Sequence, residues 1–77
     1  MYPSKYEDAL MCHVMYDPVM LSTSEQVVDS STLLKLLLET KEPLDPFTRK
    51  PLQGCEHPRL ADLQQEITSW RRKQLNA

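Results

Sequence analysis

With 77 residues, a formal net charge of −2 and 40% hydrophobic residues, the chain has the size and composition of one small globular domain. The balanced charge excludes a strongly basic nucleic-acid-binding module, and the absence of an apolar run of about 18 residues excludes a membrane-spanning helix. The polar N-terminus predicts no secretory signal, and the single glycine and two cysteines exclude glycine-rich phosphate loops and a disulfide scaffold.

The first predicted elements are a polar lead-in and a short hairpin. Residues 2–6 are expected to be loosely held. The proline that follows Asp17 forces an extended backbone there, and residues 19–21 and 26–28 are predicted to be two short strands. The serine- and threonine-rich segment 22–25 is predicted to be the turn between them, although it contains no glycine.

A leucine-rich helix is predicted after the hairpin. Asp29 and the three hydroxyl residues that follow it can accept hydrogen bonds from the free N–H groups of the first turn. The leucines cover about 200° of the helix circumference, which is wider than a helix packed on one side requires. One edge of this arc is therefore either a contact surface for a partner or is covered by loops of the same domain. Near the centre of the arc lie Leu33, Leu34 and Leu37, and at its two edges lie Leu36 and Leu38.

The segment that follows contains three prolines between positions 43 and 51. Each proline fixes its own φ and biases the preceding residue towards an extended backbone. We therefore expect a stiff, ordered loop, which would lose little conformational entropy when it binds a partner.

The last element is predicted to be an amphipathic helix, because apolar residues recur there at spacings of three and four. Pro58 is expected near its first turn. The basic run 71–73 complements the helix dipole and is interpreted as a solvated helix end, with a binding patch as the alternative. The apolar residues are Leu60, Leu63, Ile67 and Trp70.

Four residues are candidate metal ligands, but their spacing does not favour a metal site. Cys12 and His13 are adjacent and would point to opposite faces of a strand, and Cys55 and His57 are closer in sequence than a zinc knuckle requires. We expect no metal and no other cofactor, with partly buried cysteines and solvent-facing histidines. The chain is also too short for a nucleophile, its base, an oxyanion hole and a substrate cleft, so any activity is expected to depend on a partner protein.

Three strings of residues, taken in order, resemble the U-box, the zinc-free relative of the RING domain in ubiquitin ligases. They are residues 10–19 with the element M-x-D-P-V, residues 28–33, and residues 45–52 with D-P-F-T-R-x-P-L, which is the most specific. The resemblance covers about residues 8–72. It implies an α+β fold with a β-hairpin, a central helix, a proline-rich loop and a C-terminal helix.

On this resemblance, residues 1–7 are a lead-in segment, residues 8–73 the domain and residues 74–77 a tail. The implied function is that of a ubiquitin-protein ligase domain, which binds a ubiquitin-charged conjugating enzyme and promotes transfer to substrate lysines without forming a covalent intermediate itself. The implied partners are the conjugating enzyme, ubiquitin and a protein substrate, with no nucleic acid and no membrane. The implied location is the cytoplasm, or a host cytoplasm if the chain is a bacterial effector. The alternative is a degenerate U-box that binds a partner without activating transfer.

The resemblance also implies which residues form the site. Arg49 would be the catalytic residue, because its guanidinium has five donors and a permanent charge with which to bond conjugating enzyme and ubiquitin together. The alternative is an ion pair between Arg49 and Asp45 or Glu42 of its own loop. Leu10 is expected to be an exposed anchor. The residues that would contact the conjugating enzyme are Leu10 and Cys12 in the first loop, Leu36 in the central helix, and Pro46 and Pro51 in the second loop.

The sequence departs from the family pattern at several positions. Cys12 stands where the family typically has an aromatic residue, and Ser30 where it often has an arginine. The turn 22–25 lacks the usual glycine. Arg59 stands where the family has an asparagine that commonly ties the loops together, with an apparent extra residue before Leu63.

Overall fold

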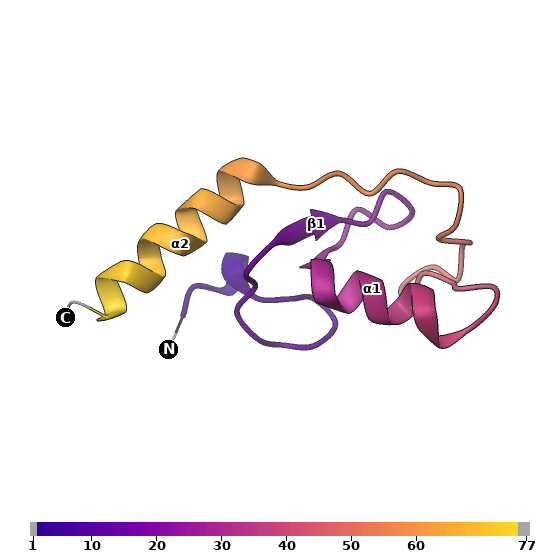
Figure 1. Ribbon diagram of the computed structural model, residues 1–77, viewed down its shortest axis with the longest axis horizontal. Coiled ribbons are helices and arrows are strands. Elements are labelled where there is room, and N and C mark those ends of the chain that lie inside the picture. Colours follow the sequence, from indigo (N-terminus) through magenta and orange to yellow (C-terminus); the bar gives the residue numbers. More distant parts are fainter. Residues whose placement is uncertain (1, 76–77) are drawn as a thin grey trace.

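The computed structural model describes residues 2–75, which form a two-stranded hairpin, two helices and a short 3₁₀ turn (Figure 1). The molecule is elongated, about 44 × 19 × 18 Å, and the hairpin lies between α1 and α2 (Figure 1). The predicted α+β order of hairpin, helix, proline-rich loop and helix is confirmed. In chain order the elements are η1 (Ser4–Tyr6), β1 (Pro18–Met20), β2 (Val27–Asp29), α1 (Ser30–Glu39) and α2 (Ala61–Leu75).

The hairpin pairs β1 with β2 in antiparallel register, with Val19 opposite Val28. Its strands lie within one residue of the predicted ones. The carbonyl of Leu21 closes the turn by accepting hydrogen bonds from the backbone N–H groups of Ser24 and Glu25. Glu25 has a φ of 60°, a left-handed conformation that favours glycine, so this turn keeps its shape without one.

Of the four candidate capping residues, Asp29 caps helix α1: its side chain accepts a hydrogen bond from the backbone N–H of Ser31. Its half-buried residues Leu33, Leu36 and Leu37 pack against the core cluster, which consists of Val19, Leu21, Val28 and Leu52.

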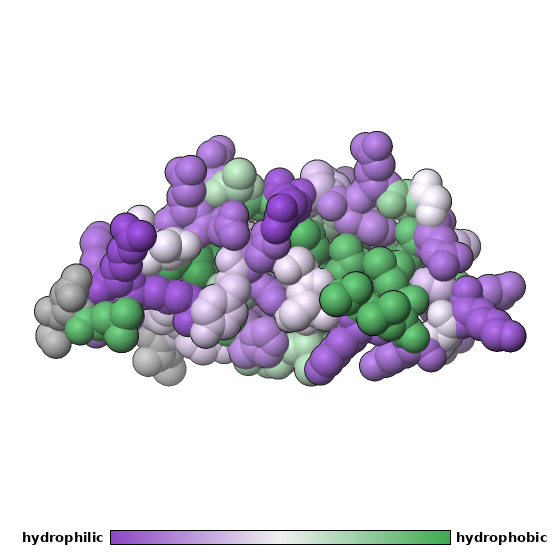
Figure 2. Space-filling model, viewed as in Figure 1, coloured by the Kyte–Doolittle hydropathy of each residue, from purple (hydrophilic) through white to green (hydrophobic). Residues whose placement is uncertain are grey.

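The prediction that Leu34 lies near the centre of the leucine arc, facing the core, was wrong. Leu34 is 57% exposed and Leu38 is 75% exposed, so the buried stripe centres on Leu33. The physical reason is that the first loop, through Leu10, packs on the Leu36 side of α1 and leaves the opposite edge open. Figure 2 shows hydrophobic residues gathered on the surface over this helix.

A second core cluster joins the N-terminal segment to α2. Tyr6, Met15 and Ile67 are buried in it, and the Tyr6 ring lies 5.7 Å from the Trp70 ring. The hydroxyl of Tyr6 also donates to Glu66 over 2.7 Å. The expectation of a loosely held lead-in was therefore wrong, because the aromatic side chain of Tyr6 is only 6% exposed and anchors that segment.

The predicted apolar face of the last helix is confirmed for its residues Leu63, Ile67 and Trp70. Leu60 precedes α2, and its carbonyl accepts the backbone N–H of Gln64. Pro58 lies shortly before α2, near its first turn but outside it, and its carbonyl accepts the backbone N–H of Met20 at the end of β1. Of the predicted tail, residues 74–75 belong to α2, and residues 76–77 lie outside the described residues.

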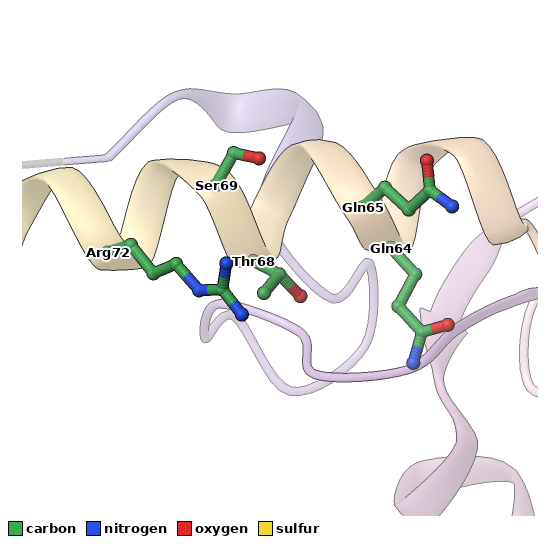
Figure 3. A pocket seen from close by; sticks show the side chains of 5 residues that line it. All are labelled: Gln64, Gln65, Thr68, Ser69 and Arg72. Atoms are coloured by element: carbon green, nitrogen blue, oxygen red, sulfur yellow. The ribbon is translucent and has the colours of Figure 1, made fainter.

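The basic end of α2 is only partly the solvated segment that the sequence predicts. Arg72 and Lys73 are exposed, but Arg71 is half-buried. Its guanidinium lies 3.8 Å from the centre of the Tyr16 ring, and its Nη2 donates to the carbonyls of Val14 and Met15. Figure 3 shows the other side of the helix, where glutamines and hydroxyl side chains form a polar surface around Arg72. Within residues 2–75 no helix is long and apolar enough to span a membrane.

Candidate functional site

Three buried aspartates hold the two loops of the candidate site in place, and Asp8 is the first of them. Its Oδ1 accepts hydrogen bonds from the backbone N–H groups of Leu10 and Met11, both at 2.8 Å. Its Oδ2 accepts from the backbone of Asp29 at 2.8 Å and from the hydroxyl of Thr32 at 2.6 Å. One carboxylate thus fixes the first loop to the junction of β2 and α1.

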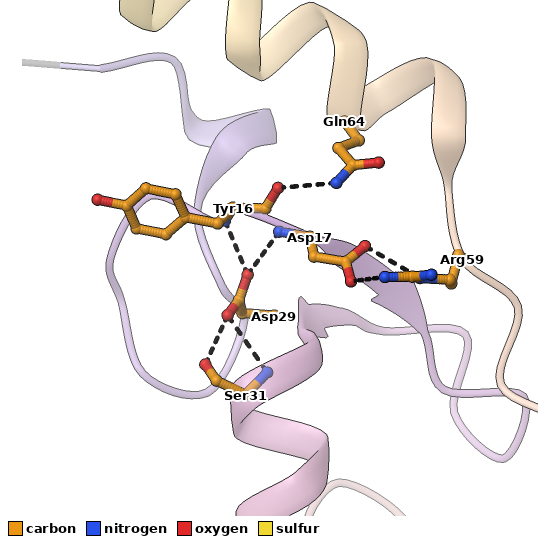
Figure 4. Close-up of polar contacts among 6 residues, drawn as sticks. All are labelled: Tyr16, Asp17, Asp29, Ser31, Arg59 and Gln64. Atoms are coloured by element: carbon orange, nitrogen blue, oxygen red, sulfur yellow. Dashed lines mark hydrogen bonds and ion pairs between the residues drawn. The ribbon is translucent and has the colours of Figure 1, made fainter.

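Asp29 is the second aspartate, and it serves two segments at once (Figure 4). Its Oδ1 accepts from the backbone N–H groups of Tyr16 and Asp17, at 2.7 and 2.8 Å. Its Oδ2 accepts from the backbone and the hydroxyl of Ser31. The residue that caps α1 therefore also positions the chain that enters β1.

Arg59, which stands where the family has an asparagine, links two segments of the domain. Its guanidinium forms an ion pair with Asp17, which joins the connection before α2 to the segment before β1 (Figure 4). This departure from the family pattern therefore contributes an ion pair between two segments of the domain. Because the Arg59 side chain is largely exposed, we assign this pair a contribution of at most about 1 kcal/mol.

Asp45 organises the second loop. Its Oδ1 accepts from the backbone N–H groups of Phe47 and Thr48, at 2.7 and 3.3 Å, and its Oδ2 accepts from the hydroxyl of Thr23 in the hairpin turn. The backbone N–H of Arg49 donates to the carbonyl of Asp45 over 2.7 Å. Arg49 is held there with a φ of 64°, so its side chain leaves the loop from a left-handed backbone conformation.

The hydrogen bonds lower the pKa of all three carboxyl groups. Burial, the largest single influence, would raise the pKa of each one. The donors around Asp8, Asp29 and Asp45 together outweigh burial, so the pKa of each lies below its ordinary value of 3.8. The three groups are therefore ionised in the folded protein at neutral pH.

These lowered pKa values predict that the domain unfolds in acid. Since the folded-state pKa lies below the unfolded-state value, the stabilisation is fully present above that value and is lost as the pH falls through the folded one. We expect the thermal midpoint, followed by circular dichroism, to stay level from about pH 7 to pH 5 and to fall steeply below about pH 4. A midpoint that is unchanged down to about pH 2 would contradict this account of the loops.

The exposure of the candidate metal ligands differs from the prediction for both cysteines and for one histidine. Cys12 and Cys55 are both free and exposed rather than partly buried, because each lies in a surface loop. His13 is exposed as expected, but His57 is half-buried. Its Nδ1 accepts from the backbone N–H of Ser22 at 3.2 Å and its Nε2 donates to the carbonyl of Leu52 at 3.1 Å, so His57 joins the hairpin turn to the second loop.

Within residues 2–75, no three His, Cys, Asp or Glu side chains come together as ligands of a metal ion. We expect a chelator such as EDTA to leave the thermal midpoint of the domain unchanged, whereas a zinc-dependent fold would lose its cooperative transition. Melting curves recorded with and without the chelator, together with metal analysis of the purified protein, check this expectation.

The structure brings two of the five predicted contact residues into one cleft. Leu10 and Leu36 line a hollow of about 300 Å³ between the first loop and α1. Pro51 lines a separate hollow of about 260 Å³, and Pro46 and Cys12 are exposed and line neither. Cys12 has a φ of 58°, so both loops present a candidate site residue from a left-handed backbone.

Leu10 differs from its expected state. It is half-buried and packs against the core cluster, rather than standing out as an exposed anchor. The cause is Asp8, which folds the first loop back over α1. The exposed apolar side chain of this loop is Met11, which lines the same cleft and is 46% exposed. Sequence reasoning missed it, although a methionine beside two predicted contact residues was a usable signal.

Arg49 is exposed and forms no ion pair with the other residues of the described chain. The carboxylate of Asp45 is occupied by backbone N–H groups and by Thr23, which leaves it unavailable to the guanidinium. The alternative of an ion pair to Asp45 or Glu42 is therefore not realised within residues 2–75. Sequence reasoning did not identify the anchoring roles of Asp8 and Asp45.

The sequence comparisons agree with this geometry. The sequence model of the U-box domain matches residues 2–76. The chain is 36% identical over 66 residues to ubiquitin conjugation factor E4 A of Rattus norvegicus, which covers 86% of this chain and 6% of that protein. It is 34% identical over 71 residues to E4 ubiquitin-protein ligase UFD2 of Saccharomyces cerevisiae, covering 92% of this chain and 7% of that protein. The chain thus spans a small fraction of the length of these relatives.

The match with the family extends over nearly the whole chain, and the fold carries its elements in the order that the family resemblance predicted. The D-P-F-T-R-x-P-L string forms the Asp45-centred loop, and the M-x-D-P-V string leads into β1. The chain therefore belongs to the U-box family and is a domain of the ubiquitin ligase type.

Proposed function

We propose that this U-box binds a ubiquitin-conjugating enzyme at the first loop, α1 and the second loop, and promotes the transfer of ubiquitin from that enzyme to lysines of a protein substrate. The observation that supports this proposal best is the cleft lined by Leu10, Met11 and Leu36. Met11 stays accessible there, because Asp8 accepts the backbone N–H groups of Leu10 and Met11 and so holds the loop in a fixed position.

The cleft suits a weak and reversible contact. Burying one large apolar side chain contributes about 1.5–3 kcal/mol, and Met11 is the most exposed apolar residue that lines it. Lys35 and Glu39 line the same cleft and provide a polar rim of mixed charge. Methionine adapts its shape to different partners, which partly compensates for the absence of an aromatic side chain at Cys12.

The chemical step would rely on positioning rather than on acid–base catalysis. A flexible ubiquitin joined to the enzyme by a thioester samples many arrangements, and holding it in one reactive arrangement lowers the entropic part of the barrier. Arg49 is suited to this role because its guanidinium is exposed and free while its backbone is fixed by Asp45. No covalent intermediate on this chain is required.

Two assays on the same protein test the proposal. One measures the binding of a panel of uncharged conjugating enzymes, and the other measures the growth of ubiquitin chains with the same panel. We expect at least one enzyme to score in both assays. Binding without transfer would favour the alternative of a non-catalytic interaction module, and neither binding nor transfer with any enzyme would contradict the proposal.

Met11→Glu is expected to weaken the binding of the conjugating enzyme by at least about tenfold, because it removes apolar area and places a carboxylate in an apolar contact. The thermal midpoint should change little, since the side chain is half in solvent already. Leu10→Glu should instead lower both binding and stability, because Leu10 packs on the core.

Leu38→Glu is the matched control for this test. It makes the same kind of change on α1, on the exposed edge that does not line the cleft. It should leave binding of the conjugating enzyme unchanged. If Leu38→Glu abolishes binding and Met11→Glu does not, the contact surface lies on the other edge of α1.

A further inference from the structure

The end of α2 combines a partly covered tryptophan with an exposed leucine. Ile67 is buried and Trp70 is half-buried on the core-facing side, whereas Leu75 at the end of the helix is 84% exposed. In Figure 1 the last turns of α2 lie at one end of the molecule, away from the hairpin. The last turn of α2 therefore presents an apolar side chain to solvent, beside the face that packs on the domain.

A hollow of about 520 Å³ lies along this uncovered stretch. Its apolar walls are Trp70, Leu75 and the ring of Tyr16, which is 67% exposed. Figure 4 shows that the Tyr16 ring points away from the aspartate whose carboxylate fixes its backbone. Arg71 and Gln74 complete the lining. The volume is sufficient for one bulky apolar side chain.

The positive charge at this hollow lacks a counter-charge within residues 2–75. The ion pairs of the described chain are Lys5–Glu66 and Arg59–Asp17, so Arg71, the one basic residue that lines the hollow, pairs with no carboxylate there. The Nη2 of Arg71 serves two backbone carbonyls, and its buried Nε–H has no acceptor. The two carbonyls and the Tyr16 ring hold the guanidinium of Arg71 in place, but no carboxylate within residues 2–75 neutralises its charge.

We propose that the hollow at the end of α2 binds an acidic peptide segment of a partner protein that carries a bulky apolar side chain. That side chain enters between Trp70, Tyr16 and Leu75, and a flanking carboxylate faces Arg71, the one basic residue of the run 71–73 that lines the hollow. A lipid surface is disfavoured because it would not fill a concave hollow. A second copy is disfavoured because a stable interface takes about 20–30 residues a side, whereas five residues line this hollow.

This surface shares no lining residue with the cleft of Leu10, Met11 and Leu36, so its test does not depend on ligase activity. Trp70 is the single tryptophan of the chain, and its fluorescence reports directly on the hollow. The probe is a capped peptide with one phenylalanine flanked by aspartates and glutamates. Two control peptides replace the phenylalanine by serine or the acidic residues by lysine.

We expect a saturable change in Trp70 fluorescence with the acidic phenylalanine peptide, and at least tenfold weaker binding of either control peptide. The affinity should fall as the salt concentration rises, because the charge contacts are screened. Leu75→Ser and Arg71→Gln should each weaken binding about tenfold or more. Gln65→Ser, on the polar outer side of α2 in Figure 3, is the matched control and should bind as the unaltered chain does.

Leu75→Ser decides the test if Arg71→Gln fails to fold, because Leu75 is almost wholly in solvent. The proposal is overturned if the acidic peptide does not bind, if the serine peptide binds equally well, or if Leu75→Ser has no effect. Binding of phosphatidylserine vesicles without peptide binding would assign the surface to lipid. A dimer in sedimentation that Leu75→Ser dissociates, again without peptide binding, would assign it to a second copy.

Discussion

Asp8→Ala is expected to lower the free energy of unfolding by about 3–5 kcal/mol, because it leaves four hydrogen-bond donors without their acceptor. Two of these donors, the backbone N–H of Asp29 and the hydroxyl of Thr32, make fully buried bonds. A domain of this length has a total stability of roughly 4–12 kcal/mol, so the loss removes a large part of it. The thermal midpoint should fall by about 15–30 °C.

Asp62→Ala is the control for this measurement. Asp62 is exposed in the first turn of α2, where it interacts with the helix dipole, and its removal should cost less than about 1 kcal/mol. If Asp8→Ala does not fold, Asp8→Asn takes its place in the measurement. Asparagine keeps the shape of the side chain, but its NH₂ group faces N–H or O–H donors that the carboxylate accepted. If both Asp8 variants melt within a few degrees of the unaltered chain, Asp8 does not anchor the first loop.

Arg49→Ala is expected to reduce ubiquitin transfer roughly ten- to a hundredfold, because a charge-assisted hydrogen bond contributes about 1.5–3 kcal/mol. Binding of the uncharged conjugating enzyme and the thermal midpoint should stay nearly unchanged. The exposed guanidinium makes no ion pair within residues 2–75, so its loss leaves no buried partner unsatisfied. Single-turnover discharge of a ubiquitin-charged enzyme onto free lysine measures the transfer step alone.

Lys50→Ala is the matched control, since it removes one exposed positive charge from the adjacent position of the same loop. It should retain nearly full transfer. Arg49→Lys adds a second comparison, because it keeps the charge but loses the fork of donors, and it should recover only part of the activity. Equal activity of Arg49→Ala and the unaltered chain would show that Arg49 does not act in transfer.

The contrast between Asp29 and Asp8 shows how far the site could be predicted from the sequence. Asp29 stands directly before a leucine-rich helix, and a capping role follows from that local position alone. Asp8 stands before a loop with no clean periodicity. Two of its four donors belong to other segments, and the other two belong to a turn that it creates itself. Its role depends on where the first loop and β2 meet in space.

The side on which each apolar residue lies shows the same division. Periodicity predicted that α1 and α2 would bury one face, and it placed Ile67 and Trp70 correctly. It did not predict that Leu10 would pack on the core or that Leu34 would be exposed. An over-wide leucine arc allows several burial patterns, and the loop that packs beside the helix selects one of them.

The sequence by itself determined the order of the elements, the start of α1, the family and the position of Arg49 in its motif. These follow from patterns a few residues long, because helix caps, turns and apolar periods depend on neighbours along the chain. The tertiary structure alone decided that Asp45 would be bound by Thr23 and so leave Arg49 free, and that Arg71 would stack on Tyr16 at the end of α2. The first contact joins two residues that are 22 positions apart in the sequence, and the second joins two that are 55 positions apart. At such separations the partner of a side chain is selected by packing and not by local sequence.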